Sequence, residues 1–462
     1  MARGLSYSLD DTIAAISTPL GEGGIGIVRL SGPESAGILR RLFRPASRRA
    51  AGGLPPRQLI LGHVIDPASG QEVDEVLVSF MPAPHTYTRQ DVVEINCHGG
   101  IVATRRVLEL CLLAGARLAG PGEFTLRAFL NGRIDLAQAE AVLDIVRAKT
   151  SAGLQVAVGQ LSGALSAWIR ALRQRMMGVQ AHVVASIDFP EDEIPQIDVG
   201  AELADIEREL AHLLETADRG IIYRQGIRTA IIGRPNVGKS SLLNALLRTN
   251  RAIVTPIPGT TRDTVEETLN LQGIPLVLVD TAGLDHAPRD PIEELGMERS
   301  RAALATADLV LAVVDGSMPL QPQDQAILGL LGERPALIVI NKCDLPQALD
   351  EGALPAGRPR VHVSALTGQG LPELEDRILD MVLGGHVTPQ NEAVVSSPRH
   401  KQALSAALES VRSARASWAQ GLPADCISID LSEALDALGQ ITGETADEEL
   451  LDRIFSEFCI GK

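Results

Sequence analysis

The chain of 462 residues has room for roughly two to four domains, and its 45% hydrophobic but only 3% aromatic content argues against an aromatic-rich β-sandwich. The net charge of −16 argues against indiscriminate binding to nucleic acid, although a local basic patch can still bind a folded RNA. No apolar run approaches the roughly 20 residues that span a bilayer, and acidic residues near the N-terminus argue against a secretory signal, so we expect a soluble cytoplasmic protein.

The N-terminal half of the chain shows two successive patterns. Up to about residue 120, glycine and proline turns alternate with short apolar runs such as 75–80 and 92–95, which predicts an α+β domain. From residue 122 to about 220 the apolar residues recur at helical spacing, for example at 137–145 and 201–214. This second region is therefore predicted to be helical.

From residue 226 onward, strands and helices alternate. Four apolar runs have the composition of fully buried parallel strands, namely 229–232, 276–279, 309–314 and 336–340. The helical pattern returns after about residue 383. There Asp430 with Glu433, and Thr445 with Glu448, have the spacing of capping boxes, which predicts the starts of two late helices.

These patterns predict a multidomain fold. We expect an α+β N-terminal domain over residues 1–125, and an all-α helical domain formed by residues 126–223 and 385–462. An α/β domain over residues 224–384 is expected to be inserted into the helical domain. The pattern alone leaves open whether the two helical parts pack together.

A phosphate-binding loop follows the first strand of the predicted α/β domain. The sequence GRPNVGKS at 233–240 lies between an apolar run and a helical run, which is the context that a P-loop requires. Gly233 and Gly238 let the backbone N–H groups point at phosphates, and the helix adds its positive N-terminal end. Lys239 is expected to reach the β- and γ-phosphates, and the Ser240 hydroxyl is expected to bind Mg²⁺.

Four further motifs follow in the order typical of GTP-binding domains. They are GTTRD at 259–263, DTAG at 280–283, NKCD at 341–344 and SAL at 364–366. Thr261 is predicted to complete the Mg²⁺ shell, with Asp280 near the metal through a water. Asp344 can accept hydrogen bonds from both N1–H and the 2-amino group of guanine, a pair that adenine lacks. The ordered set therefore indicates GTP, and it identifies the expected α/β domain over residues 224–384 as one of the P-loop GTPase (Ras-like) type.

The residue after the DTAG motif is Leu284, where many GTPases have a glutamine that orients water. Leu284 cannot perform this task, so charge stabilisation must come from elsewhere. The Asn236 amide oxygen, with carbonyls of residues 255–260, can hold a monovalent cation against the phosphates, which would neutralise charge in the transition state. The alternative, equally weighted, is that Asn236 only hydrogen-bonds the loop.

The five cysteines form no C-x-x-C pair, so neither a disulfide framework nor a zinc site is indicated. Four of them are interpreted as small core residues in a reducing compartment, namely Cys97, Cys111, Cys343 and Cys426. Cys459 is the fourth residue from the end of the given sequence, which is the position of a prenylated cysteine, but the residues after it are poor for prenylation, and we reject that interpretation.

Over essentially its whole length the sequence resembles the MnmE (TrmE) family of tRNA modification GTPases. The resemblance rests on the GTPase motifs above and, more specifically, on segments outside the nucleotide domain. These are GIGIVR at 24–29, residues 91–100, residues 120–141 and the tail FCIGK at 458–462.

The resemblance implies a folate-binding N-terminal domain that also forms a homodimer, and a potassium-dependent GTPase domain. It implies a flavoprotein partner, MnmG (GidA), which carries FAD, in a heterotetramer. Together the two proteins would attach an aminomethyl or carboxymethylaminomethyl group to carbon 5 of the wobble uridine of certain tRNAs. The one-carbon unit would come from 5-formyl- or methylene-tetrahydrofolate.

The resemblance also implies ligands for the nucleotide and its ions. Potassium would be bound by Asn236, Thr255, Ile257 and Thr260, and Mg²⁺ by Ser240 and Thr261. The nucleotide would contact Asn236, Val237, Gly238, Lys239, Ser240, Ser241, Thr255, Pro256, Ile257, Pro258, Gly259, Thr260, Thr261, Asp280, Thr281, Ala282, Gly283, Asn341, Lys342, Asp344, Ser364, Ala365 and Leu366.

Three catalytic residues are carried over from the family, namely Glu293, Lys239 and Cys459. Glu293 is placed by counting back from the sequence LGMER at 295–299, and Glu294 is a possible substitute because this loop is one residue longer than expected. A carboxylate there can orient the attacking water. Cys459 is implied to act near the folate, in a chemical role that the sequence does not define.

For folate, the matching positions are Arg29, Glu94, Arg133 and Lys462. Glu94 can accept hydrogen bonds from the 2-amino and N3–H edge of the pterin, and the cations can bind its carboxylate tail or carbonyl. Many family members have lysine in place of Arg133, which keeps the charge but changes the geometry.

Two alternatives remain. One is a ribosome-assembly GTPase, which shares the P-loop motifs but is expected to carry an RNA-binding module or a second GTPase domain. The other is a folate-binding scaffold that is gated by nucleotide with negligible turnover.

Overall fold

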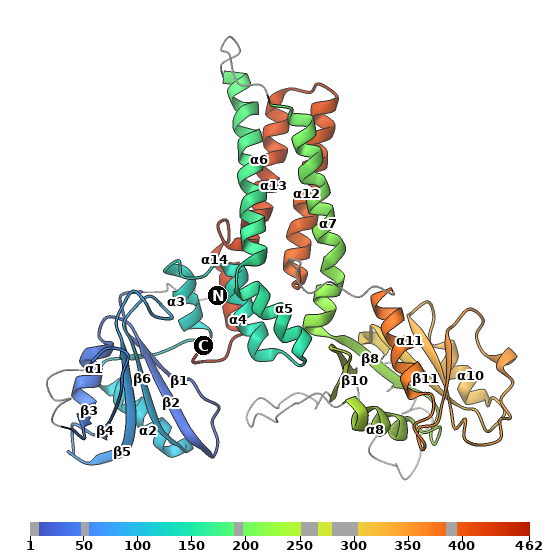
Figure 1. Cartoon of the computed structure of the whole chain (residues 1–462), viewed down its shortest axis with the longest axis horizontal. Helices are drawn as coiled ribbons and strands as arrows, with labels where there is room; N and C mark the ends of the chain where they lie inside the picture. The colour runs from blue at the N-terminus through green and yellow to red at the C-terminus, as the bar shows by residue number, and fades with distance from the viewer. Residues whose placement is uncertain (1–8, 48–54, 189–196, 251–266, 280–303, 385–394) are drawn as a thin grey trace, which may run out of the picture.

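The computed structural model describes residues 9–47, 55–188, 197–250, 267–279, 304–384 and 395–462. A bundle of long helices stands between two domains that each contain a β-sheet, one on either side of the foot of the bundle (Figure 1). Within these residues, no helix combines the length and apolarity needed to cross a membrane.

The N-terminal domain is built on a seven-stranded sheet in the order β3-β4-β5-β6-β2-β1-β7. Its strands are β1 (Ile13–Ile16), β2 (Gly23–Ser31), β3 (Phe43–Pro45), β4 (Leu59–Ile65), β5 (Glu72–Met81), β6 (Val92–Gly99) and β7 (Arg117–Leu118). All neighbours are antiparallel except β1 and β7. Two helices, α1 (Ser35–Leu42) and α2 (Ile101–Leu113), complete the predicted α+β fold.

The two faces of this sheet carry different side chains because residues alternate along each strand. Val28 and Leu30 of β2 are fully buried in the main core, together with residues of α1 and α2. Arg29 lies between them and therefore faces the other side. A smaller core of Ile13, Ala15, Ala119 and Phe124 is separate from the main core.

The helical domain contains eight helices among the described residues. They are α3 (Glu123–Leu130), α4 (Leu136–Arg147), α5 (Ser151–Leu161), α6 (Ala164–Asp188), α7 (Val199–Gln225), α12 (Pro398–Ala419), α13 (Ala424–Thr442) and α14 (Glu448–Ser456). The helices α6, α7, α12 and α13 form the upright bundle in Figure 1. Their aliphatic side chains share one core, so the two helical parts of the sequence pack together.

The two predicted late helices exist as α13 and α14, but the sequence placed their starts wrongly. Asp430 lies inside α13, which begins at Ala424 because its buried apolar face already includes Ile427. At α14 the N-cap is Asp447, whose carboxylate accepts from the Leu450 N–H at 2.8 Å. The Thr445 hydroxyl instead donates to the Asp436 carbonyl.

The interpretation of four cysteines as core residues is only partly correct. Cys97 and Cys111 are buried in the N-terminal domain, but Cys343 is half-buried and Cys426 is exposed on α13.

The nucleotide domain lies in the sequence between α7 and α12. Its six-stranded sheet has the order β13-β12-β11-β8-β10-β9 and is parallel except for the hairpin of β9 and β10. The strands are β8 (Ile227–Ile232), β9 (Glu267–Leu271), β10 (Ile274–Val279), β11 (Leu309–Asp315), β12 (Ala336–Asn341) and β13 (Arg360–Val363). The described residues of this domain include the helices α8 (Lys239–Asn250), α10 (Pro322–Gly329) and α11 (Leu371–Leu383), with a short 3₁₀ helix at Glu351–Ala353.

The predicted P-loop α/β architecture, inserted into a helical domain, is confirmed. Each of the four predicted buried strands lies within an observed parallel strand. The helix α7 continues to Gln225, two residues beyond the predicted boundary, and α3 spans the boundary that the sequence placed after residue 125.

Candidate functional site

The P-loop occupies residues 233–238, between the end of β8 and the start of α8. Both of its glycines are required by close packing as well as by their positive φ angles of +155° and +97°. A Cβ atom on Gly233 would lie 2.4 Å from the Val313 carbonyl oxygen, and one on Gly238 would lie 2.2 Å from Asn341 Nδ2. The loop is therefore held close to two neighbouring strands of the sheet.

Lys239 is the first residue of α8. Its ammonium group donates to the carbonyls of Gly233 and Arg234 at 2.8 and 2.9 Å, and burial lowers its pKa. The ammonium thus lies over the loop, next to the positive end of a helix. This combination is suited to binding phosphate.

Asn341, at the end of β12, connects two of the predicted nucleotide-binding segments. It is 2% exposed, and its Nδ2 donates to the Val237 carbonyl at 2.8 Å. Its Oδ1 accepts from the Ala365 N–H at 3.0 Å. The side chain therefore contacts the protein on both sides and braces the P-loop against the segment that follows β13.

The neighbouring residues of the NKCD motif differ in their surroundings. Lys342 has a φ of +67° and forms an ion pair of 2.6 Å with Asp315 at the end of β11. Burial alone would raise the pKa of Asp315, but hydrogen bonds from Lys342 and Ser317 outweigh it and lower the pKa. Asp344 and Leu366 are both exposed, so they remain accessible to a base.

One contact of the P-loop was missed by the sequence analysis. Arg234 Nε lies 3.1 Å from Oδ2 of Asp324, in the first turn of α10. Since 90 residues separate the two, no local pattern could have revealed this pair.

The structure gathers the predicted nucleotide residues at one edge of the sheet, where the carboxyl ends of β8, β11, β12 and β13 meet. Ligands bind at this edge in open α/β sheets. The remaining predicted residues lie outside the described part of the chain. They are Thr255, Pro256, Ile257, Pro258, Gly259, Thr260, Thr261, Asp280, Thr281, Ala282, Gly283, Leu284, Glu293 and Glu294.

A second group of predicted residues meets on the N-terminal domain. Arg29 and Glu94 are direct cross-strand partners on β2 and β6. Arg29 contacts Glu94 Oε1 through Nε at 2.9 Å and through Nη2 at 2.8 Å. Both side chains are about one-quarter exposed, so the pair is accessible.

Two aromatic rings of one small core, Phe124 and Tyr87, lie against Arg29 and Arg133. The Arg29 guanidinium lies 5.8 Å from the centre of the Phe124 ring, and that of Arg133 lies 4.8 Å from the centre of the Tyr87 ring. Burial raises the pKa of Tyr87, an effect that its hydrogen bond with Thr125 and the charges of both arginines oppose. Tyr87 was not identified from the sequence, since an aromatic residue in a loop carries no motif of its own.

The C-terminal tail returns to this domain. Ile460 forms a β-bridge with Pro121, and the Phe124 N–H donates to the Lys462 carbonyl at 3.1 Å. Gly461 has a φ of +95°, and a Cβ there would lie 2.3 Å from the Ile16 carbonyl oxygen, so the contact requires glycine. Cys459 is exposed in this tail. The fold therefore brings the tail to Phe124, beside the predicted folate residues.

Comparisons with known proteins agree with this arrangement. The family model "GTP-binding protein TrmE N-terminus" matches residues 12–133, and that of the "MnmE helical domain" matches residues 136–459. Among solved structures, the G domain of the T. maritima FeoB iron transporter covers 34% of this chain and 98% of its own, at 27% identity. Its TM-score of 0.24 is too low to support a conclusion.

Curated relatives match along the whole chain. Proteins named tRNA modification GTPase MnmE from Chloroflexus aurantiacus and Moorella thermoacetica are each 52% identical and cover 98% of this chain and 100% of their own lengths. The one from Geobacillus kaustophilus is 50% identical over 98% of this chain and 99% of its own. The chain therefore belongs to the MnmE (TrmE) family of tRNA modification GTPases.

Proposed function

We propose that this GTPase modifies carbon 5 of the wobble uridine of certain tRNAs together with a flavoprotein partner, MnmG (GidA). The added group is a carboxymethylaminomethyl or aminomethyl group, and its one-carbon unit comes from a tetrahydrofolate derivative. The observation that supports this most is the return of the tail that carries Cys459 to the N-terminal domain, next to Phe124 and the Arg29–Glu94 pair. FAD belongs to the partner, in a heterotetramer.

In this proposal the nucleotide domain binds GTP through the P-loop. Lys239 binds the β- and γ-phosphates, while Ser240 and Thr261 bind Mg²⁺. Asp344 selects guanine, because its exposed carboxylate, three residues after the end of β12, can accept from both N1–H and the 2-amino group of that base. Hydrolysis drives a conformational change rather than the carbon chemistry itself.

Leu284 stands where many GTPases have a catalytic glutamine, and a potassium ion supplies the charge stabilisation that is missing here. Asn236, with Thr255, Ile257 and Thr260, holds the ion against the phosphates. Asn236 is exposed in the P-loop and has a φ of +63°, so its amide is accessible at the phosphate end of the site. The ion's positive charge offsets negative charge that builds up in the transition state.

The attacking water is oriented by an acidic residue that follows the second switch. Glu293 is our assignment, with Glu294 as the substitute. Glu293→Ala should retain GTP binding and slow hydrolysis, whereas unchanged turnover would remove Glu293 from the mechanism.

The folate derivative binds on the N-terminal domain. The side chains of this site fit a folate chemically. Both contacts of Arg29 with Glu94 go to the carboxylate oxygen Oε1, so the other oxygen, Oε2, can accept hydrogen bonds from the pterin. Arg133 and Lys462 supply positive charge for its carboxylates. The Tyr87 ring lies beside Arg133, is only partly buried and offers an apolar face to the pterin, whereas the Phe124 ring supports Arg29 from inside the core.

The domains work as three units, namely the N-terminal domain, the helical domain and the nucleotide domain. The first unit also forms the homodimer.

The decisive experiment is mass spectrometry of tRNA from cells that lack this protein. We expect the modified wobble uridine to disappear and to return when the intact chain is supplied, but not when Lys239→Ala is supplied. A normal level of the modification in the deleted cells would refute the proposed function.

A further inference from the structure

One helix lies at the foot of the bundle, between the N-terminal domain and the nucleotide domain (Figure 1). This helix, α4, has charged residues at positions 140, 144 and 147, a spacing of four and then three that places them on one face. Each of the three pairs with a different segment of the chain. The helix therefore contacts several parts of the molecule at once.

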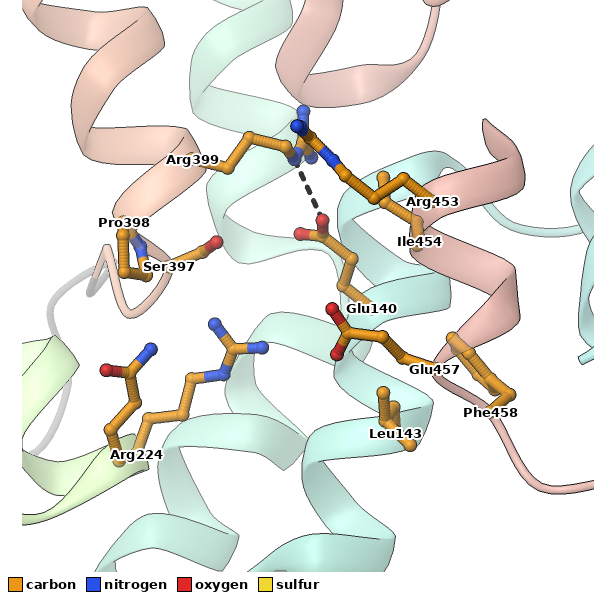
Figure 2. A pocket seen from close by; sticks show the side chains of 11 residues that line it. Glu140, Leu143, Arg224, Ser397, Pro398, Arg399, Arg453, Ile454, Glu457 and Phe458 are labelled. Atoms are coloured by element: carbon orange, nitrogen blue, oxygen red, sulfur yellow. Dashed lines mark hydrogen bonds and ion pairs between the residues drawn. The ribbon is translucent and has the colours of Figure 1, made fainter. Parts of the chain in front are cut away.

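Two of these pairs hold the segments that lead into and out of the nucleotide domain. Asp144 accepts from Arg224 Nε at 2.6 Å, and only Gln225 and Gly226 separate Arg224 from β8. Glu140 accepts from Arg399 Nε at 2.8 Å (Figure 2). Arg399 lies in the first turn of α12, the helix that follows the nucleotide domain in the sequence.

A third contact reaches the nucleotide domain directly. Thr150, the N-cap of α5, accepts from the Gly153 N–H at 3.1 Å and donates to the Gly273 carbonyl at 2.7 Å. A Cβ on Gly273 would lie 2.9 Å from Ala152 Cβ, so the two surfaces are in close contact. Gly273 lies in the turn of the β9–β10 hairpin, whose outer ends continue into both predicted switch segments.

The last residue of α4 holds the tail. Arg147 Nη2 donates to the Glu457 carbonyl at 2.7 Å, and its Nη1 lies 3.2 Å from Glu457 Oε2. Cys459 is only two residues further along the chain. A shift in the end of α4 therefore acts on the backbone that carries Cys459.

A cavity of about 230 Å³ separates these elements. Charged side chains from α4, α7, α12 and α14 line it, and Arg224 and Glu457 project towards it (Figure 2). Pockets for drug-sized ligands span roughly 300–1,000 Å³ and are mostly apolar. The cavity is therefore too small and too charged for a folate, and it gives the surrounding side chains space to rearrange.

We propose that this face of α4 and the adjoining Thr150 transmit the nucleotide state to the tail. A change at the switch segments moves the β9–β10 turn and the end of α7. Through Thr150 and Asp144 it then reaches the last turn of α4, where Arg147 acts as a positioning residue for Cys459. The inference extends the proposed function, because it assumes that the GTP cycle and Cys459 serve one reaction.

The test measures how fast iodoacetamide alkylates Cys459 in the full chain carrying Cys343→Ser and Cys426→Ser. Burial raises the pKa of Cys97 to about 11 and that of Cys111 to about 12, so Cys459 is the reactive thiol that remains. We expect the rate to differ severalfold between GDP and a non-hydrolysable GTP analogue.

The variants form matched pairs. Thr150→Asp keeps the N-cap of α5 but cannot donate to Gly273, whereas Thr150→Ser keeps both contacts. Arg147→Gln breaks the contact with Glu457. Its control is Arg208→Gln, which breaks an exposed ion pair with Asp205 on α7, away from this route. Thr150→Asp and Arg147→Gln should bring the ratio of rates close to one, and the two controls should retain it.

Two results would overturn the proposal: equal rates with the two nucleotides in the chain that carries only Cys343→Ser and Cys426→Ser, or a full ratio in both Thr150→Asp and Arg147→Gln. Arg147 is more than half exposed, so its substitution is not expected to unfold the chain, and binding of labelled GDP verifies this. The assay contains no folate, tRNA or partner. A negative result in the alkylation assay therefore does not imply that the proposed function is wrong. An error in the proposed function is detected separately, by mass spectrometry of tRNA.

Discussion

The side-chain amide of Asn341 donates to the carbonyl of Val237 at 2.8 Å, so the end of β12 holds the P-loop in place. The same side chain accepts from the Ala365 N–H and is almost fully buried. We predict that Asn341→Ala weakens GDP binding by about 1–3 kcal/mol, or roughly 5- to 150-fold in Kd, because it leaves buried backbone groups without partners. Titration with a fluorescent GDP analogue measures this. The exposed Asn244→Ala on α8 is the control, and equal affinities would show that Asn341 does not shape the loop.

The second prediction concerns the monovalent cation. With Leu284 in place of a glutamine, hydrolysis should be at least about tenfold faster in KCl than in NaCl at equal ionic strength, since loss of one charge-stabilising group commonly costs that much or more. Asn236→Ala should remove the difference, and phosphate release at saturating GTP measures it. Equal rates for the unmodified chain in the two salts would eliminate the potassium mechanism.

The sequence predicted those parts of the molecule whose determinants are local. The P-loop was identifiable because its glycines, its lysine and the flanking strand and helix are contiguous. Buried strands such as 309–314 were recognisable by their unbroken apolar runs, and the observed strand extends by only one residue, to Asp315. The capping-box pattern failed at Asp430 because it spans few residues and occurs by chance inside a helix.

The contacts that complete the sites could not be predicted, because they join distant segments. Asn341 and Val237 are 104 positions apart, and Ser17 Oγ donates to the Gly461 carbonyl across 444 positions. The resemblance pointed to the tail but gave no physical reason for it. The structure supplies one, since only glycine fits at 461 against the Ile16 carbonyl.

The third prediction concerns folate. Glu94→Gln should weaken binding of 5-formyl-tetrahydrofolate by about tenfold or more, since hydrogen bonds to a charged group contribute about 1.5–3 kcal/mol. Arg133→Lys should cost less than about tenfold, because it keeps a cation near the Tyr87 ring, and Arg133→Ala should cost more. Isothermal titration calorimetry measures these affinities. Arg105→Ala on α2 is the control, and Glu94→Gln with unchanged affinity would move the folate site elsewhere.

The fourth prediction separates the tRNA modification from GTP hydrolysis. Cys459→Ser should abolish the tRNA modification but leave GTP hydrolysis unchanged, because the thiol lies in the tail that packs on the N-terminal domain. The matched control is Cys426→Ser, which replaces another exposed cysteine, on α13. Mass spectrometry of tRNA and phosphate release are measured on the same variants. If Cys459→Ser supports normal modification, the thiol has no chemical role.

The fifth prediction concerns acid stability, through Glu140. Burial alone would raise the pKa of this carboxyl above its usual value of 4.5, but contacts with His400 and Arg399 outweigh burial and lower the pKa. Burial also lowers the pKa of His400, so we take Arg399 to be the charged partner at neutral pH. A carboxyl whose pKa is lower in the folded state stabilises the fold fully above its unfolded pKa. It loses this contribution as the pH falls through the folded value.

Glu140→Gln should therefore destabilise the helical domain by about 3–5 kcal/mol near neutral pH, because it leaves the Arg399 guanidinium without its carboxylate. The difference between variant and unmodified chain should shrink as the pH falls below 4.5, the usual pKa, because the carboxyl of the unfolded chain then binds a proton while the folded chain still holds it ionised. Urea unfolding followed by far-UV circular dichroism at several pH values measures both effects. Glu109→Gln, which alters an exposed pair with Arg106, is the control and should change little. A deficit for Glu140→Gln that stayed constant as the pH falls would show that packing, and not charge, makes this residue important.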